Sequence, residues 1–189
     1  GITRVGAYSF YSCYAENVFL PESLKSIGEN AFNGNDFDYV FINDGLTTIG
    51  ESAFECCNKL TALRLPETLT AIGEYAFYGC SKLENVYIPD SVVKVGHSAF
   101  RECSALAYVY IGFGLITIQD TTFYSCVNLE EVFVDYDSKL KTIKYAAFGD
   151  CTRLRKIDLP ESVTKIEDDN FLGKNTVISC TYDSYVMNY

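Results

Sequence analysis

The stretch IGEYAFYGCSKLENVYIPDS, residues 72–91, spaces its apolar side chains in a way that fits neither one helix nor one strand. Polar residues and glycine separate Phe77, Cys80, Leu83, Val86 and Ile88. The same pattern returns along the whole chain, and its phenylalanine recurs in steps of 22 to 25 residues. This phenylalanine stands at Phe10, Phe32, Phe54, Phe77, Phe100, Phe123, Phe148 and Phe171. A fixed period of this size is the signature of a solenoid.

Other columns keep their distance from the repeated phenylalanine. Five residues before it stands a branched aliphatic residue in every unit: Val5, Ile27, Ile49, Ile72, Val95, Ile118, Ile143 and Ile166. Three residues after it stands a cysteine in six units, whereas Asn35 and Lys174 take the position in the other two. Further on, apolar pairs such as Val86/Ile88 alternate with an outward residue, and all four prolines directly follow such a pair.

These columns predict one superhelical turn per unit. The alternation of Val86, Tyr87 and Ile88 predicts a short strand that ends at Pro89, because proline cannot donate to a ladder. We expect the glycine at the position of Gly96 to ease a turn, and Ser98–Cys103 to form a single helical or 3₁₀ turn. One unit cannot bury its own apolar face, so about eight stacked units would share a continuous core and a parallel sheet.

The chain resembles the BspA-like class of leucine-rich repeats. The resemblance is carried by Ile88-Pro89-Asp90-Ser91-Val92, Val95-Gly96, Ala99-Phe100, Cys103 and Leu106, and it recurs through nearly the whole sequence. It implies a repeat solenoid, a right-handed superhelix with a parallel sheet on one face and short helical turns, 3₁₀ turns or loops on the other. Residues 1–189 would form one such domain, with incomplete or capping end units and a closing segment at 178–189. Two extra residues near Asp135–Ser138 should bulge from one edge.

The resemblance also implies a role and a place. Members of this class occur on secreted or surface proteins of bacteria and some protists, and named relatives are adhesins that bind host matrix proteins or other cells. This implies a binding module at the cell surface or in the extracellular space. The shared residues are core residues, so they indicate the fold and leave the ligand open.

Eight cysteines raise the question of disulfides. Six of them share one column, where stacked side chains point the same way rather than toward one another. In leucine-rich repeats that column holds Asn or Cys turned inward toward backbone groups, so we expect buried free thiols. Cys56 and Cys180 lie off the column, and any bond they form stays open. A zinc site is not expected, because the chain has no C-x-x-C and one histidine.

The sequence gives little sign of catalysis or of a cofactor. His97 is the single histidine, in a column otherwise held mainly by Glu and Asp, and we expect it to be solvated. No phosphate-binding glycine loop is present. The acidic column could collect calcium, but carboxylate rows are more often a solvated face, so we expect neither metal nor cofactor. A net charge of −10 opposes nucleic-acid binding, and no apolar run is long enough to span a membrane.

The outward residues of the strands form the most informative column. Exposed aromatic side chains gathered on one sheet face exceed what solubility requires, and tyrosine is favoured at interfaces. The alternative is a cross-strand aromatic ladder that only stabilises the sheet. If a partner docks, we expect it to contact Tyr39, Phe41, Arg64, Tyr87, Tyr108, Tyr110 and Phe133.

Two functions follow from that surface. The first is a non-enzymatic module that binds a protein or a glycan, such as a host matrix or cell-surface component. The second is a structural spacer, or a solenoid that associates with its own kind as a weak homodimer.

Overall fold

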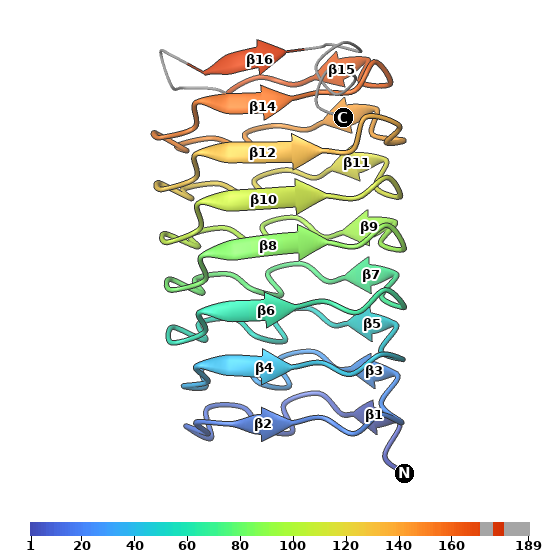
Figure 1. Ribbon diagram of the computed structural model, residues 1–189. Helices are drawn as coiled ribbons and strands as arrows, with labels where there is room; N and C mark the ends of the chain where they lie inside the picture. The colour runs from blue at the N-terminus through green and yellow to red at the C-terminus, as the bar shows by residue number, and fades with distance from the viewer. Residues whose placement is uncertain (171–175, 180–189) are drawn as a thin grey trace, which may run out of the picture.

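The computed structural model describes residues 1–170 and 176–179, which form one continuous stack of turns with β1 and β2 at one end and β15 and β16 at the other (Figure 1). Each turn contributes one strand of two to four residues to a front column and a two-residue strand to a back column. The front strands are β2 Val18–Phe19, β4 Tyr39–Phe41, β6 Ala62–Arg64, β8 Asn85–Ile88, β10 Tyr108–Ile111, β12 Glu131–Val134, β14 Lys156–Asp158 and β16 Val177–Ser179. The back strands are β1 Arg4–Val5, β3 Ser26–Ile27, β5 Thr48–Ile49, β7 Ala71–Ile72, β9 Lys94–Val95, β11 Thr117–Ile118, β13 Thr142–Ile143 and β15 Lys165–Ile166.

All strand pairs are parallel, and their register follows the repeat. Val86, Val109, Val132 and Ile157 lie side by side across β8, β10, β12 and β14. The front column consists of two ladders, β2–β4–β6 and β8–β10–β12–β14–β16, and the back column also changes ladder, between β9 and β11. The predicted parallel solenoid is therefore confirmed.

The core is a stack of phenylalanines that runs along the solenoid. Rings of neighbouring turns from Phe10 to Phe148 lie 5.2–5.6 Å apart with interplanar angles of 3–11°. From Phe32 to Phe148 these side chains are at most 1% exposed, whereas Phe10 is 47% exposed because no described turn covers it. The return path adds Val92 and Val95, both buried as expected.

The segment that carries each phenylalanine is not helical in the described residues, which corrects the expectation for Ser98–Cys103. Ser98 and Glu102 have φ values of +54° and +61°, and left-handed residues recur at these two positions in the neighbouring turns, for example at Tyr75 and Gly79 and at Thr121 and Ser125. The backbone N–H of Phe100 donates to Thr122 of the next turn at 2.9 Å, and that of Glu102 donates to Tyr124 at 2.9 Å. These bonds between turns alternate with turn bonds inside the segment, from Arg101 N–H to Ser98 and from Cys103 N–H to Phe100, so the segment forms successive tight turns.

The cysteine column forms a second ladder, in which each thiol bonds to the preceding turn. The Sγ atom of Cys103 lies 3.2 Å from the carbonyl oxygen of Phe77, and Cys57, Cys80, Cys126 and Cys151 repeat this contact at 3.1–3.4 Å. Asn35 donates from Nδ2 to two carbonyls, those of Phe10 and Phe32. These five cysteines are buried free thiols, as expected.

Two other cysteines, Cys13 and Cys56, are not buried. Cys13 belongs to the same column but is exposed, because no described turn packs against that end. The expectation that the column is buried is wrong at this position. Cys56 is a partly exposed free thiol, and Cys180 lies outside the described residues, as do Phe171, Lys174 and most of the predicted closing segment.

Thiol reactivity should follow this division. Burial raises the pKa of Cys57 and Cys151 to about 12 and those of Cys80, Cys103 and Cys126 well above the ordinary value. Since the thiolate is the reactive species, an alkylating reagent at pH 8 should modify Cys13 at least about a hundredfold faster than Cys103. Peptide mapping by mass spectrometry over time measures both rates. Equal rates in the folded protein would contradict the buried ladder.

The extra residues in the turn after β12 leave the stack intact. Asp135, Tyr136 and Asp137 are exposed, and Tyr136 is 70% exposed. The front ladder nevertheless continues from β12 to β14 in register. The predicted bulge is confirmed.

Candidate binding surface

The outward side chains of the front strands form an aromatic face. Inward neighbours such as Val86 and Val109 are at most 1% exposed, because strand residues alternate between the two sides of a sheet. The register places Tyr87, Tyr110 and Phe133 directly beside one another on β8, β10 and β12. We call the following set the aromatic face: Phe19, Tyr39, Phe41, Arg64, Tyr87, Tyr108, Tyr110 and Phe133.

Most of these rings are open to solvent. Tyr39, Phe41, Tyr87 and Tyr110 are 43–49% exposed, and Phe19 is 77% exposed. Arg64 is exposed, whereas Tyr108 and Phe133 are half-buried. The fold thus brings all seven residues predicted as a binding surface onto the outer side of the front column of strands.

One pair on this face also supports the sheet. The rings of Tyr110 and Phe133 lie 4.6 Å apart with an interplanar angle of 10°. Stacked aromatic pairs across strands contribute about 0.5–1.5 kcal/mol beyond their buried area. The ladder interpretation therefore applies to this pair, and the remaining rings are free to make other contacts.

Two shallow hollows interrupt the aromatic face. The first, which we call the Tyr110 hollow, is lined by Tyr87, Asp90, Tyr110, Ile111, Gly112, Phe133, Val134 and Asp135. The second, the Ala62 hollow, is lined by Thr61, Ala62, Leu63, Glu84 and Asn85. Ala62 occupies the row that holds Tyr39 on β4, so its small side chain leaves space on the sheet surface.

The floor of the Tyr110 hollow is fixed by a close contact between turns. Asp90 accepts a hydrogen bond from the backbone N–H of Phe113 at 3.1 Å. A Cβ atom on Gly112 would lie 2.4 Å from the same carboxylate oxygen, so only glycine fits beneath it. Burial raises the pKa of Tyr87, and the charges of Asp90, Glu67 and Asp135 raise it further. The hollow is therefore an aromatic site in a negative field.

Carboxylates continue along the edge of the sheet beyond this hollow. From β2 to β14, each turn except that of β10 places an acidic residue one to three positions after its front strand. We call this row the acidic rim: Glu22, Asp44, Glu67, Asp90, Asp135, Asp137 and Glu161. Sequence reasoning missed it, although the acids recur with the repeat and could have been found from the position after each proline.

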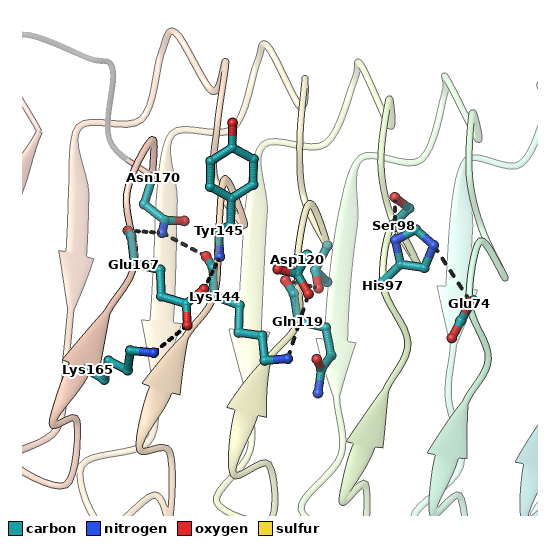
Figure 2. A network of polar contacts seen from close by, with 11 residues as sticks. Glu74, His97, Ser98, Gln119, Asp120, Lys144, Tyr145, Lys165, Glu167 and Asn170 are labelled. Atoms are coloured by element: carbon teal, nitrogen blue, oxygen red, sulfur yellow. Dashed lines mark hydrogen bonds and ion pairs between the residues drawn. The ribbon is translucent and has the colours of Figure 1, made fainter.

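A separate polar network lies on the turn that carries the phenylalanines (Figure 2). The His97 ring packs edge-on against Tyr75 at 4.5 Å, and its Nε2 lies 3.6 Å from a Glu74 oxygen. The Ser98 hydroxyl lies 3.3 Å from His97 Nδ1. Ser98 is completely buried and also bonded to Thr121, so a substrate cannot reach its hydroxyl. His97 is half-buried rather than fully solvated as expected.

The remainder of that network consists of exposed ion pairs along neighbouring turns. Lys144 lies 3.8 Å from Asp120, and Lys165 lies 2.6 Å from Glu167 (Figure 2). The bond from Lys165 lowers the pKa of Glu167. Exposed pairs of this kind contribute little to stability. No group of three or more His, Cys, Asp or Glu within residues 1–170 and 176–179 is arranged to hold a metal ion.

The described part of the chain also has no apolar helix of the length that crosses a bilayer.

Comparison with known families gives a match over almost the whole chain. The model described as "BspA type Leucine rich repeat region (6 copies)" matches residues 3–130 and residues 77–188. No curated protein matched the sequence.

Solved structures with the same architecture come from bacteria. A leucine-rich repeat protein of T. pallidum is 32% identical, with a TM-score of 0.73 over 81% of this chain and 72% of its own. A leucine-rich cell surface protein of Faecalibacterium prausnitzii A2-165 is 27% identical, with a TM-score of 0.59 over 96% of this chain and 58% of its own. The pneumococcal vaccine antigen PcpA is 22% identical, with a TM-score of 0.64 over 88% of this chain and 42% of its own, and shows likeness of fold.

Proposed function

Because the chain belongs to the BspA-type leucine-rich repeat family, we propose that it is a non-enzymatic binding module of a cell-surface or secreted protein. Residues 1–189 would form one solenoid of about eight units. The partner, a protein or a glycan of a host matrix or another cell, would dock on the aromatic face. The similarity to a cell surface protein of F. prausnitzii supports the location.

The observation that supports this proposal is the solvent exposure of the rings on the aromatic face. Four of its rings are 43–49% exposed although the alternation of the strands gives each of them a fixed place on a rigid sheet. Rigid tyrosines lose little conformational entropy on binding and supply large contact areas, which is why they are enriched at interaction sites. A sheet that needed only solubility would carry charged or small residues there.

Removing two central rings should abolish most of the binding. We expect the double variant Tyr87→Ala/Tyr110→Ala to bind at least about thirtyfold more weakly than the parent to whichever purified extracellular-matrix protein the parent recognises. Surface plasmon resonance against a panel of such proteins measures this loss.

The matched control removes two exposed tyrosines elsewhere. Tyr11 and Tyr145 are 49% and 50% exposed and lie on the turns outside the aromatic face. The variant Tyr11→Ala/Tyr145→Ala should bind like the parent. If the control loses binding while the first variant keeps it, the partner docks on the turns and our choice of surface is wrong.

Self-association is the second candidate function. Tyr110 stacks on Phe133 within this face, and in a dimer the exposed rings of two copies would stack in the same way. Sedimentation over a concentration series distinguishes the candidates. Reversible dimers that disappear in Tyr87→Ala/Tyr110→Ala would favour the homodimer over an external ligand.

A further inference from the structure

Both hollows of the aromatic face combine an apolar floor with carboxylates at the margin. In the Tyr110 hollow the rings of Tyr87 and Tyr110 lie beside Asp90 and Asp135. In the Ala62 hollow Leu63 and Ala62 lie beside Glu84. A side chain with a long aliphatic stem and a cationic end matches this combination, because the stem covers apolar surface while the charge reaches the margin.

The charges around the face are strongly one-sided. The acidic rim has seven carboxylates, whereas the segments between front and back strands that carry it hold three basic residues, Lys25, Lys139 and Lys141. The Nζ atom of Lys139 lies 5.4 Å from the centre of the Phe113 ring. Among the ion pairs of the described residues, none involves Glu67, Asp90 or Asp135. Their charge is therefore available to a partner.

The molecule already shows how a basic side chain fits such surroundings. The guanidinium of Arg101 lies 4.9 Å from the ring centre of Tyr124 and 6.0 Å from that of Tyr78, which belong to the turns on either side. Its Nε donates to Glu102 at 3.2 Å. The same arrangement of rings from successive turns beside a carboxylate occurs in the Tyr110 hollow, where no arginine of the described chain lines it.

We propose that the partner of this face is a basic polypeptide segment that places Lys or Arg side chains in the Tyr110 and Ala62 hollows. This rests on the proposed function and names the chemistry of its ligand. The Tyr110 hollow is centred on β10 and the Ala62 hollow between β6 and β8, about three residues earlier along the strands. The two centres are therefore roughly 13 Å apart, so basic residues about four positions apart in an extended segment reach both.

Charge complementarity favours this occupant over the other candidates. Two copies of this chain would each bring a net charge of −10 and an acidic rim, which repel one another. Sulfated glycans are repelled for the same reason. A neutral glycan would leave the carboxylate charge uncompensated at the contact.

The test uses a short peptide of alternating Arg and Ser, with the corresponding Glu/Ser peptide and a neutral maltooligosaccharide as comparison probes. We expect the parent protein to bind the Arg/Ser peptide alone, and binding to weaken as salt is added. The rim variant Glu67→Gln/Asp90→Asn/Asp135→Asn should bind it at least about fivefold more weakly, because each exposed pair contributes modestly. Isothermal titration calorimetry measures these affinities.

A charge-matched control separates a site from general attraction to an acidic protein. The variant Glu29→Gln/Glu51→Gln/Asp168→Asn removes the same number of charges from exposed positions on the turns. It should keep binding within about twofold of the parent. Equal losses in both variants, or tighter binding of the maltooligosaccharide, would overturn the inference. If binding to a matrix protein is lost in Tyr87→Ala/Tyr110→Ala but kept in the rim variant, the proposed binding function is supported. The proposal that the partner is basic is then wrong.

Discussion

Replacing Phe100 by alanine should lower the free energy of unfolding by about 3–5 kcal/mol. The ring is completely buried and stacked between Phe77 at 5.2 Å and Phe123 at 5.6 Å. Its loss removes two ring contacts and leaves a cavity that the rigid ladders of hydrogen bonds on both sides cannot close. Because each turn is stabilised mainly by its neighbours, the defect weakens two interfaces at once.

Urea unfolding followed by circular dichroism measures this loss, and the repeat itself supplies a control. Phe10 occupies the same column but is 47% exposed and stacks on Phe32 alone. Phe10→Ala should therefore cost no more than about 1–2 kcal/mol. The variant Phe100→Leu keeps most of the side-chain volume and should fold even if Phe100→Ala does not. Similar losses at positions 10 and 100 would contradict a core built from stacked turns.

The period of the sequence predicts the core columns because the same position meets the same neighbours in every turn. The burial of Leu83, Val86 and Ile88 follows from this rule, as does the inward cysteine column. The rule fails near the two ends of the described stack. Phe10 and Cys13 are exposed at one end, and Ile166 on β15 is 42% exposed at the other. The position of a residue in the repeat therefore predicts whether its side chain is buried, provided that a turn packs against it on both sides.

The conformation of the turns could not be predicted in the same way. The residues around Phe100 are compatible with a helical turn when considered locally. Hydrogen bonds from Phe100 to Thr122 and from Glu102 to Tyr124 hold successive tight turns with left-handed residues instead. Those bonds join residues more than twenty positions apart, so a local pattern contains no information about them.

The candidate site was predictable in part. The alternation of the strands predicts that Tyr87 and Tyr110 point outward, and the structure places them so. The two hollows depend on how closely Gly112 approaches Asp90 and on the space that Ala62 leaves. Such distances between turns are properties of the stack, and single residue types do not reveal them.

The glycines at the position of Gly96 also have a role that the sequence did not predict. We expected them to ease a turn of the backbone. Gly96 has no left-handed φ, so the turn itself does not require glycine. A Cβ atom at this position would lie 2.4 Å from the backbone nitrogen of Glu74 and 2.5 Å from the carbonyl carbon of Gly73. Glycine is present because it lets two turns approach each other. Gln119 stands at the break between the two back ladders, whereas Lys144 and Glu167 occupy the same column within the continuous ladder β11–β13–β15.

Replacing Gly96 by alanine should consequently destabilise the protein by about 1–3 kcal/mol or more, since the methyl group must push apart two backbones. The substitution also strains the bond from the Gly96 N–H to Ile72, which is 2.9 Å long. Urea unfolding gives the change in free energy, and hydrogen exchange at residue 96 reports the opening of β7 from β9.

The same substitution at the end of the column has the opposite expected sign. At Gly6 the nearest contact of an added Cβ atom is the flexible hydroxyl of Ser9 at 3.2 Å. Gly6→Ala should leave stability unchanged or raise it by up to about 1 kcal/mol, because alanine restricts the unfolded chain. If both alanine variants proved equally stable, the close approach of the turns would not explain the glycines. The column would then have to reflect a requirement of the turn itself, which the φ angle of Gly96 does not support.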